Sequence, residues 1–129
     1  MRARMVRFYD QIQREGGGRV HELAIAESVV ETIAARTGER TVHKIHLEVG
    51  RLSGVSADAL RFCFEVAAAD TAADGATLVI DEPPGRAHCV TCGEEFVVEE
   101  PVLLCGCGSS DVRVLAGEEL RILSVEVSR

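Results

Sequence analysis

Apolar residues beyond Glu22 recur along the chain at intervals of three and four, which is the spacing of a helix with one buried face. The repeating positions are Leu23, Ala26, Val30 and Ile33. Charged residues occupy the other faces of this segment, and Gly38 fits a helix stop. The pattern therefore predicts an amphipathic helix that begins at Glu22 and ends near Gly38.

After this helix the apolar period changes to two, which is typical of half-buried strands. The alternating residues are Ile45, Leu47 and Val49 in one segment, and Leu123, Val125 and Val127 near the C-terminus. Residues 76–81 (ATLVID) form another predicted strand, and Ser56 can cap a second helix. The apolar side of that helix is Leu60, Cys63, Phe64 and Ala67. We predict an α+β fold: a small sheet with two helices, to which the C-terminal strand returns.

A short cysteine-bearing segment interrupts these elements. It contains two hairpins, Cys89-x-x-Cys92 and Cys105-x-Cys107. Zinc prefers four tetrahedral ligands, and two facing cysteine hairpins supply four thiolates. The glycine after each hairpin allows the positive φ of a tight knuckle. We predict an inserted zinc-ribbon module, in which Zn(II) is structural because no coordination position is left open for water.

Other interpretations of the cysteines are two disulfides or four incidental thiols. Five cysteines in a chain without a recognisable export signal favour a reducing compartment and metal ligation. His88 could replace a ligand if the second hairpin bound through one sulfur only. We expect Cys63 to be a small buried hydrophobe rather than a nucleophile.

Charge divides the chain at a triple glycine. Residues 1–19 carry a net charge of +3, whereas the other residues carry −10. The glycines at 16–18 predict a flexible joint. We divide the chain into an N-terminal extension (1–19), an α+β domain (20–84 and 116–129) and a zinc-ribbon domain (85–115).

The totals exclude several classes of protein. A net charge of −7 argues against sequence-independent binding of nucleic acid, which depends on neutralising phosphates. No apolar run is long enough to span a bilayer, and the first residues lack the apolar region of a signal peptide. We therefore expect a cytoplasmic protein without a membrane partner. The sequence offers neither a nucleophile paired with a base nor an open metal site, so we do not expect an enzyme.

Several segments, in this order, resemble the HypA/HybF hydrogenase nickel-incorporation proteins. They are HELAIAESVVETI, LEVGRLSGVSADALRFCFEVAAADTAADGATLVI, the two cysteine hairpins and GEELRILSVEV. The resemblance covers residues 20 to 127, and it implies a nickel metallochaperone that delivers Ni(II) to the large subunit of [NiFe] hydrogenase. It also implies a HypB-type GTPase as partner, and urease maturation proteins as partners of some members. The zinc ligands that it implies are Cys89, Cys92, Cys105 and Cys107.

The family begins Met-His-Glu and builds its nickel site at that terminus, from the imidazole and nearby backbone nitrogens. Carried onto this chain, the nickel residues are His21 and Glu22. Ni(II) favours nitrogen ligands in planar geometry, and we expect the ion to be bound transiently. On the residues alone, His21 would be an exposed histidine, and Glu22 an acid near the positive end of a helix dipole. We interpret His43 and His46 as sheet residues.

The chain departs from the family pattern at two places. The second hairpin is CxC instead of CxxC, which changes the geometry expected at zinc. Residue 20 is valine where the family has its initiating methionine, so His21 lacks a neighbouring free amine. A GTG codon is read as valine internally and as methionine at a start. We therefore expect the native chain to begin at codon 20, which makes residues 1–19 a mis-annotated start.

The alternative hypothesis is a zinc-ribbon adaptor for proteins or nucleic acid, without a nickel role. Such an adaptor is expected to have a basic face with interleaved aromatic residues. Residues 86–115 instead contain two arginines against five acids, and Phe96 is their only aromatic residue.

Overall fold

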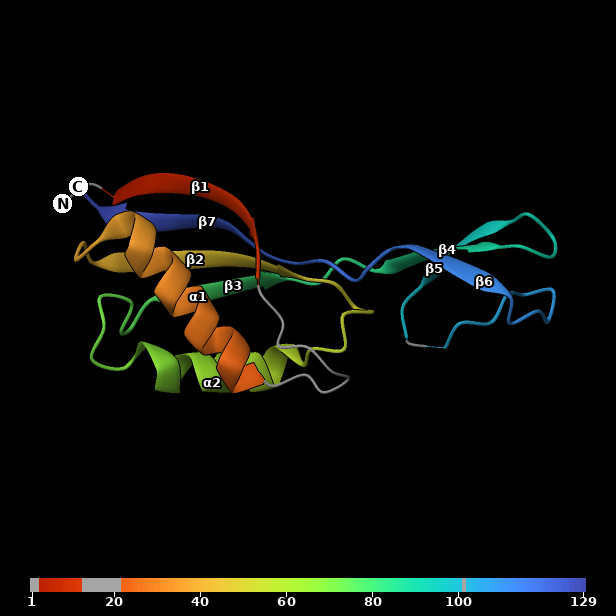
Figure 1. Ribbon diagram of the computed structural model, residues 1–129, viewed down its shortest axis with the longest axis horizontal. Coiled ribbons are helices and arrows are strands. Elements are labelled where there is room, and N and C mark those ends of the chain that lie inside the picture. Colours follow the sequence, from red (N-terminus) through yellow and green to blue (C-terminus); the bar gives the residue numbers. More distant parts are fainter. Residues whose placement is uncertain (1–2, 13–21, 101) are drawn as a thin grey trace.

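The computed structural model describes residues 3–12, 22–100 and 102–129. It consists of a larger lobe with two helices and a smaller lobe of short strands, joined by two extended segments (Figure 1). The larger lobe contains β1 (Ala3–Gln11), α1 (Glu22–Thr37), β2 (Val42–Val49), α2 (Ala57–Ala68), β3 (Thr77–Asp81) and β7 (Leu120–Ser128). The smaller lobe contains β4 (Gly85–Cys89), β5 (Glu95–Val98) and β6 (Val112–Ala116). The predicted α+β fold is confirmed.

The main sheet has the strand order β1-β7-β2-β3. β7 lies antiparallel to both β1 and β2, and β2 and β3 are parallel because α2 crosses between them. Both helices cover the same face of the sheet (Figure 1). The fully buried side chains of this lobe include Val29, Ile33, Ile45, Leu47, Leu60, Ile122, Val125 and Val127. The C-terminal strand therefore returns to the main sheet, as predicted.

The buried face of α1 is rotated slightly from the one that the sequence predicted. Ala26 and Ile33 are buried as expected, but Leu23 is 44% exposed, and Ile25 and Val29 take the central positions. α2 follows the prediction more closely, since the hydroxyl of Ser56 accepts a hydrogen bond from the backbone N–H of Ala59. Leu60 and Phe64 are buried, and Cys63 packs against the same core as a partly buried side chain.

The pattern of the first residues predicted no strand, yet residues 3–11 form β1 at the edge of the main sheet. Phe8 and Ile12 are each only 6% exposed and belong to the core of the larger lobe. The predicted joint at residues 16–18 lies outside the described residues. No described helix is long and apolar enough to cross a membrane.

The loop after β2 joins the two lobes. Its backbone N–H groups donate to both connecting segments: Gly50 to the carbonyl of Glu119 (2.7 Å) and Leu52 to that of Gly117 (2.8 Å). The N–H of Arg51 donates to the carbonyl of Pro83 at 3.0 Å. One short loop therefore holds the chain as it enters and as it leaves the smaller lobe.

Candidate metal sites

Two tight knuckles at one end of the smaller lobe present the four hairpin cysteines. In the first, the N–H of Gly93 donates to the carbonyl of Cys89 at 2.9 Å. In the second, the N–H of Gly108 donates to the carbonyl of Cys105 at 2.9 Å. Both glycines have positive φ, 81° and 94°, which a residue with a Cβ rarely adopts. The structure therefore contains the two glycine knuckles that the sequence predicted.

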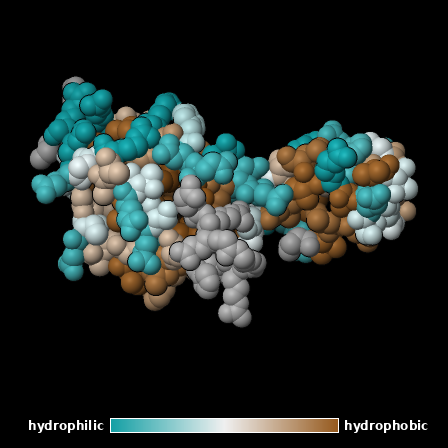
Figure 2. All heavy atoms as spheres, in the orientation of Figure 1, coloured by the Kyte–Doolittle hydropathy of each residue, from teal (hydrophilic) through white to brown (hydrophobic). Residues whose placement is uncertain are grey.

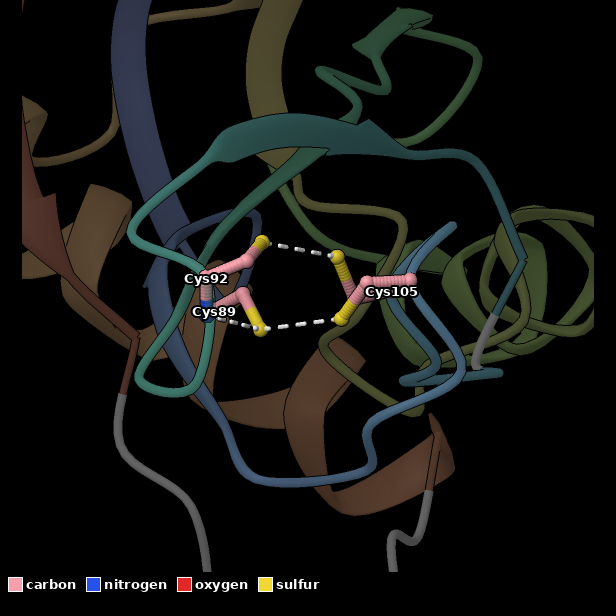
Figure 3. A group of neighbouring side chains, drawn as sticks. Cys89, Cys92 and Cys105 are labelled. Carbon is pink, nitrogen blue, oxygen red and sulfur yellow. Dashed lines mark hydrogen bonds between the residues drawn. The ribbon is translucent and has the colours of Figure 1, made fainter.

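The sulfur atoms of the two knuckles face one another (Figure 3). The Sγ atoms of Cys92 and Cys105 are 3.6 Å apart, and those of Cys89 and Cys107 are 3.8 Å apart. All four sulfur atoms lie within 4.8 Å of one another. Four thiolates at a Zn–S distance of about 2.3 Å form a tetrahedron with edges of about 3.8 Å. The CxC hairpin therefore still places both of its sulfur atoms at distances that suit a tetrahedral ion.

The disulfide interpretation does not fit these distances, because a disulfide requires about 2.05 Å between the two sulfur atoms. The four cysteines are free thiols in the structure. In the described part of the chain they form the only cluster of three or more His, Cys, Asp or Glu side chains that could hold a metal ion. His88 precedes Cys89 on β4 and is not a member of this group.

The thiols of this cluster do not titrate alike. The backbone N–H of Cys92 donates to the sulfur of Cys89 and, together with the thiols of Cys92 and Cys105, lowers the pKa of Cys89 to about 6. The N–H of Cys107 favours the thiolate of Cys105, but burial and the neighbouring thiols outweigh it and raise the pKa of Cys105 to about 12. The thiolate of Cys89 therefore forms at a much lower pH than that of Cys105, and a bound cation is needed to remove the proton of Cys105 near neutral pH.

The knuckles are fixed to each other by polar contacts as well. The hydroxyls of Thr91 and Ser109 lie 2.8 Å apart, and the N–H of Val90 donates to the carbonyl of Asp111 at 2.9 Å. The spacing of the cysteines does not indicate these contacts. Hydroxyl residues within cysteine knuckles are the signal that could have found them, because they can bond to the neighbouring loop.

Of the two predicted nickel residues, only Glu22 is described, and it lies in the larger lobe. His21 lies outside the described residues. Glu22 is the first residue of α1, and its Oε2 accepts a hydrogen bond from the backbone N–H of Ser56 at 3.2 Å. Ser56 is the N-cap of α2, so the carboxylate lies at the N-terminal ends of both helices, where it is electrostatically favoured.

Two described histidines of the larger lobe, His43 and His46, are sheet residues, as expected. Nε2 of His43 lies 2.6 Å from the hydroxyl of Ser128, and Nε2 of His46 lies 2.8 Å from a carboxylate oxygen of Asp81. Both belong to β2, and neither is part of the cysteine group.

Residues 20–127 match a family model described as hydrogenase/urease nickel incorporation, metallochaperone, hypA. The chain belongs to the HypA family. It is a nickel-incorporation metallochaperone of hydrogenase maturation and not an enzyme. The part shared with HypA begins at Val20-His21-Glu22 and leaves β1 outside it.

Two curated relatives support the assignment to HypA. The hydrogenase maturation factor HypA of Geobacter metallireducens is 47% identical over 109 residues, which cover 84% of this chain and 99% of that protein. The hydrogenase maturation factor HypA of a Nostoc species is 42% identical over 108 residues, which cover 84% of this chain and 96% of that protein.

A solved HypA structure has the same fold. The solution structure of the nickel metallochaperone HypA from Helicobacter pylori superposes with a TM-score of 0.57 at 22% sequence identity. The match covers 84% of this chain and 97% of that one.

Proposed function

We propose that this HypA protein binds Ni(II) through His21 and Glu22 and delivers it to the large subunit of [NiFe] hydrogenase. The observation that supports this site is the position of Glu22, whose carboxylate lies where the N-termini of α1 and α2 meet. This position fixes the chain directly after His21. Imidazole is a ligand that Ni(II) favours, and the ion can be released because protonation competes for the same nitrogen.

Zn(II) is the proposed occupant of the four-cysteine group, with Cys89, Cys92, Cys105 and Cys107 as ligands. The sulfur spacing fits a tetrahedral ion, and four thiolates leave no position for a substrate. Zinc would therefore hold the knuckles together, and the nickel carried by the protein would bind elsewhere.

The proposed partners are a HypB-type GTPase and the hydrogenase large subunit, in the cytoplasm; a role in urease maturation is compatible with the family description. The smaller lobe offers a surface for protein contacts, because apolar side chains gather on it (Figure 2). The exposed ones are Val90, Val97, Val102, Leu103, Leu104 and Leu115. Exposed apolar clusters of this kind are typical of interaction surfaces.

Nickel titration by calorimetry, on protein already loaded with zinc, tests the nickel site. We expect one bound Ni(II), and loss of that binding in the His21→Ala variant. His43→Ala is the matched control, because His43 is an exposed histidine of β2 whose partner is Ser128. Titrating the full chain beside a chain that starts at Val20, with methionine in its place, shows whether a free amine next to His21 strengthens binding.

Three results would count against the proposal. Unchanged nickel binding in His21→Ala would exclude that histidine as a ligand. Equal losses in His21→Ala and His43→Ala would indicate a nonspecific effect. A protein that binds zinc but no nickel in either form would favour the adaptor hypothesis.

A further inference from the structure

Strand β1 is an addition to the part of the chain that the HypA family shares. The family model begins at residue 20, whereas β1 comprises Ala3–Gln11. β1 nevertheless occupies a full edge of the main sheet, alongside the nine-residue strand β7 (Figure 1). A chain without β1 would therefore leave this edge of β7 open.

Contacts with the shared part of the chain fix β1 firmly. Phe8 and Ile12 are buried in the core, and the N–H of Ile12 donates to the carbonyl of Leu120 at 2.9 Å. From α1, the guanidinium of Arg36 lies 4.0 Å from the centre of the Phe8 ring and donates to the carbonyl of Arg7 at 3.0 Å. β1 is thus packed as an integral strand of the larger lobe.

The edge that β1 covers has the features of a pairing surface. β7 is the longest strand of the shared part of the chain, and four of its side chains are buried: Leu120, Ile122, Val125 and Val127. A long open strand with apolar side chains on one face is a template for pairing with another chain.

Two copies of β7 can pair with each other in antiparallel orientation, because residues at equal distances from the middle of the strand match in character. If two copies pair antiparallel with Leu123 opposite Ser124, then Leu120 faces Val127 and Ile122 faces Val125. Both residues of each pair face the core. The core-facing positions of β7 are even-numbered before Leu123 (Leu120 and Ile122) and odd-numbered after it (Val125 and Val127). That change occurs at Leu123, because Leu47 and His46 of β2 pair with Ile122 and Ser124. The irregularity would therefore lie on the two-fold axis.

The charged residues of β7 also fit this register. The register places Arg121 of one copy opposite Glu126 of the other, and this pair occurs twice in a symmetric dimer. These two residues point to the face of the sheet opposite to the core residues, where Arg121 now contacts Glu48 at 2.7 Å. Opposite charges directly across a strand pair are favourable, and a two-fold interface uses one patch from each copy.

β1 itself forms a poor edge for further pairing. It carries Arg4, Arg7 and Asp10, and its register with β7 shifts between Arg7 and Asp10. Tyr9 in this irregularity has a φ of 55°, so the backbone cannot continue as a flat strand. Charges and bulges are the devices that protect sheet edges. At the other edge, β3 has only five residues and ends just before Pro83.

We propose that the β7 edge is a pairing site for a second copy of this chain, and that β1 closes it. With β1 in place the protein is a monomer at this edge. Without β1, two copies join their main sheets through antiparallel β7 strands.

Sedimentation equilibrium of the zinc-loaded full chain, beside a chain starting at Val20 with methionine there, tests the proposal. We expect a monomer for the full chain and a concentration-dependent dimer for the short chain. A short chain that is folded and monomeric at every concentration, or a full chain that dimerises equally well, would overturn it. The full chain with Phe8→Asp is a second test, because the charge expels β1 from the core; it should dimerise as the short chain does.

Charge variants of the short chain identify the interface. Glu126→Arg should weaken the dimer by about tenfold or more, because the repelling pair occurs twice. Adding Arg121→Glu to it should restore pairing. Glu65→Arg is the matched control, since it makes the same charge change on the exposed side of α2. A dimer that is equally stable with Glu126→Arg and with Glu65→Arg would exclude the β7 edge as the interface.

Discussion

Gly117 and Gly50 set how closely the two lobes approach. Gly117 has a φ of 110°, and a Cβ added to it would lie 2.5 Å from the Cα of Gly85. A Cβ on Gly50 would overlap the carbonyl of Gly117. The close approach of the two lobes therefore depends on having no side chain at these two glycines, because the loop after β2 contacts both connecting segments through backbone atoms.

Replacing Gly117 with alanine should lower the free energy of unfolding by about 2 kcal/mol or more, since both the backbone angle and the contact with Gly85 oppose a Cβ. Urea unfolding measures the loss. Gly75→Ala is the control, because Gly75 also has positive φ (78°) but open space around it. Equal losses in the two variants would show that the contact with Gly85 contributes nothing.

The unequal thiols predict how zinc binding depends on pH. The pKa of Cys89 is lowered from 9.0 to about 6, so its thiolate is present above that pH and is lost as pH falls through it. For the folded smaller lobe, the stability that this shift supplies is complete above about pH 9 and disappears near pH 6. Zinc affinity, measured by competition with a chelator, should therefore fall more steeply with acid below about pH 6 than above it.

Cys89→Ser is the variant that checks this assignment. It removes the thiol that ionises first, so the change of slope near pH 6 should disappear along with most of the affinity. A slope change that persists in Cys89→Ser would assign the titration to another group.

Among the secondary-structure elements, the two helices are joined at their N-termini by the bond from Ser56 to Glu22. The two residues are 34 positions apart, and no local pattern in the sequence indicates that they meet. The amphipathic spacing predicted both helices, but it could not predict which N-terminus would lie against which carboxylate, because packing on the sheet decides that.

Glu22→Ala should cost about 1 kcal/mol of stability, because the N–H of Ser56 loses its partner. Glu22→Gln keeps an acceptor oxygen and should retain most of that stability. Thermal unfolding compares the variants, and nickel titration of Glu22→Gln then isolates the carboxylate charge. The bond has no structural role if Glu22→Ala unfolds at the same temperature as the unchanged protein.

The sequence predicts strands where apolar and polar residues alternate regularly, and it misses strands where that alternation is interrupted. β2 alternates through Ile45, Leu47 and Val49, and it was predicted. In β1 Phe8 is buried, and so is Ile12 just after the strand, but the alternate position between them is the charged Asp10, where the register with β7 shifts. The cysteine spacing likewise predicted the metal ligands as a group, whereas the contact between Thr91 and Ser109 depends on how the two knuckles meet.

At the scale of the whole molecule, the two lobes are stabilised differently. The larger lobe has a continuous core formed by both helices and the main sheet. In the smaller lobe the buried hydrophobic residues are Ala87, Cys89, Val98 and Cys105, so half of them are metal-ligand candidates. A core of this size cannot offset the entropy of ordering the lobe without a bound ion.

Removing zinc with a chelator should therefore unfold the smaller lobe and leave the larger one folded. Hydrogen exchange read by mass spectrometry should show protection lost in β4, β5 and β6 but kept in β2 and β7. A protein whose β2 and β7 lose protection together with β4 would indicate that the two lobes fold as one unit.

The close passage of Gly85 and Gly117 also makes the smaller lobe removable. The chain leaves the larger lobe and returns to it at nearly the same point, so residues 86–116 could be excised and the gap closed by a short turn. Conversely, another domain whose termini lie close together could be transplanted there. An engineer could thus exchange the smaller lobe of this metallochaperone while leaving the main sheet, and the helix α1 that begins at Glu22, uninterrupted.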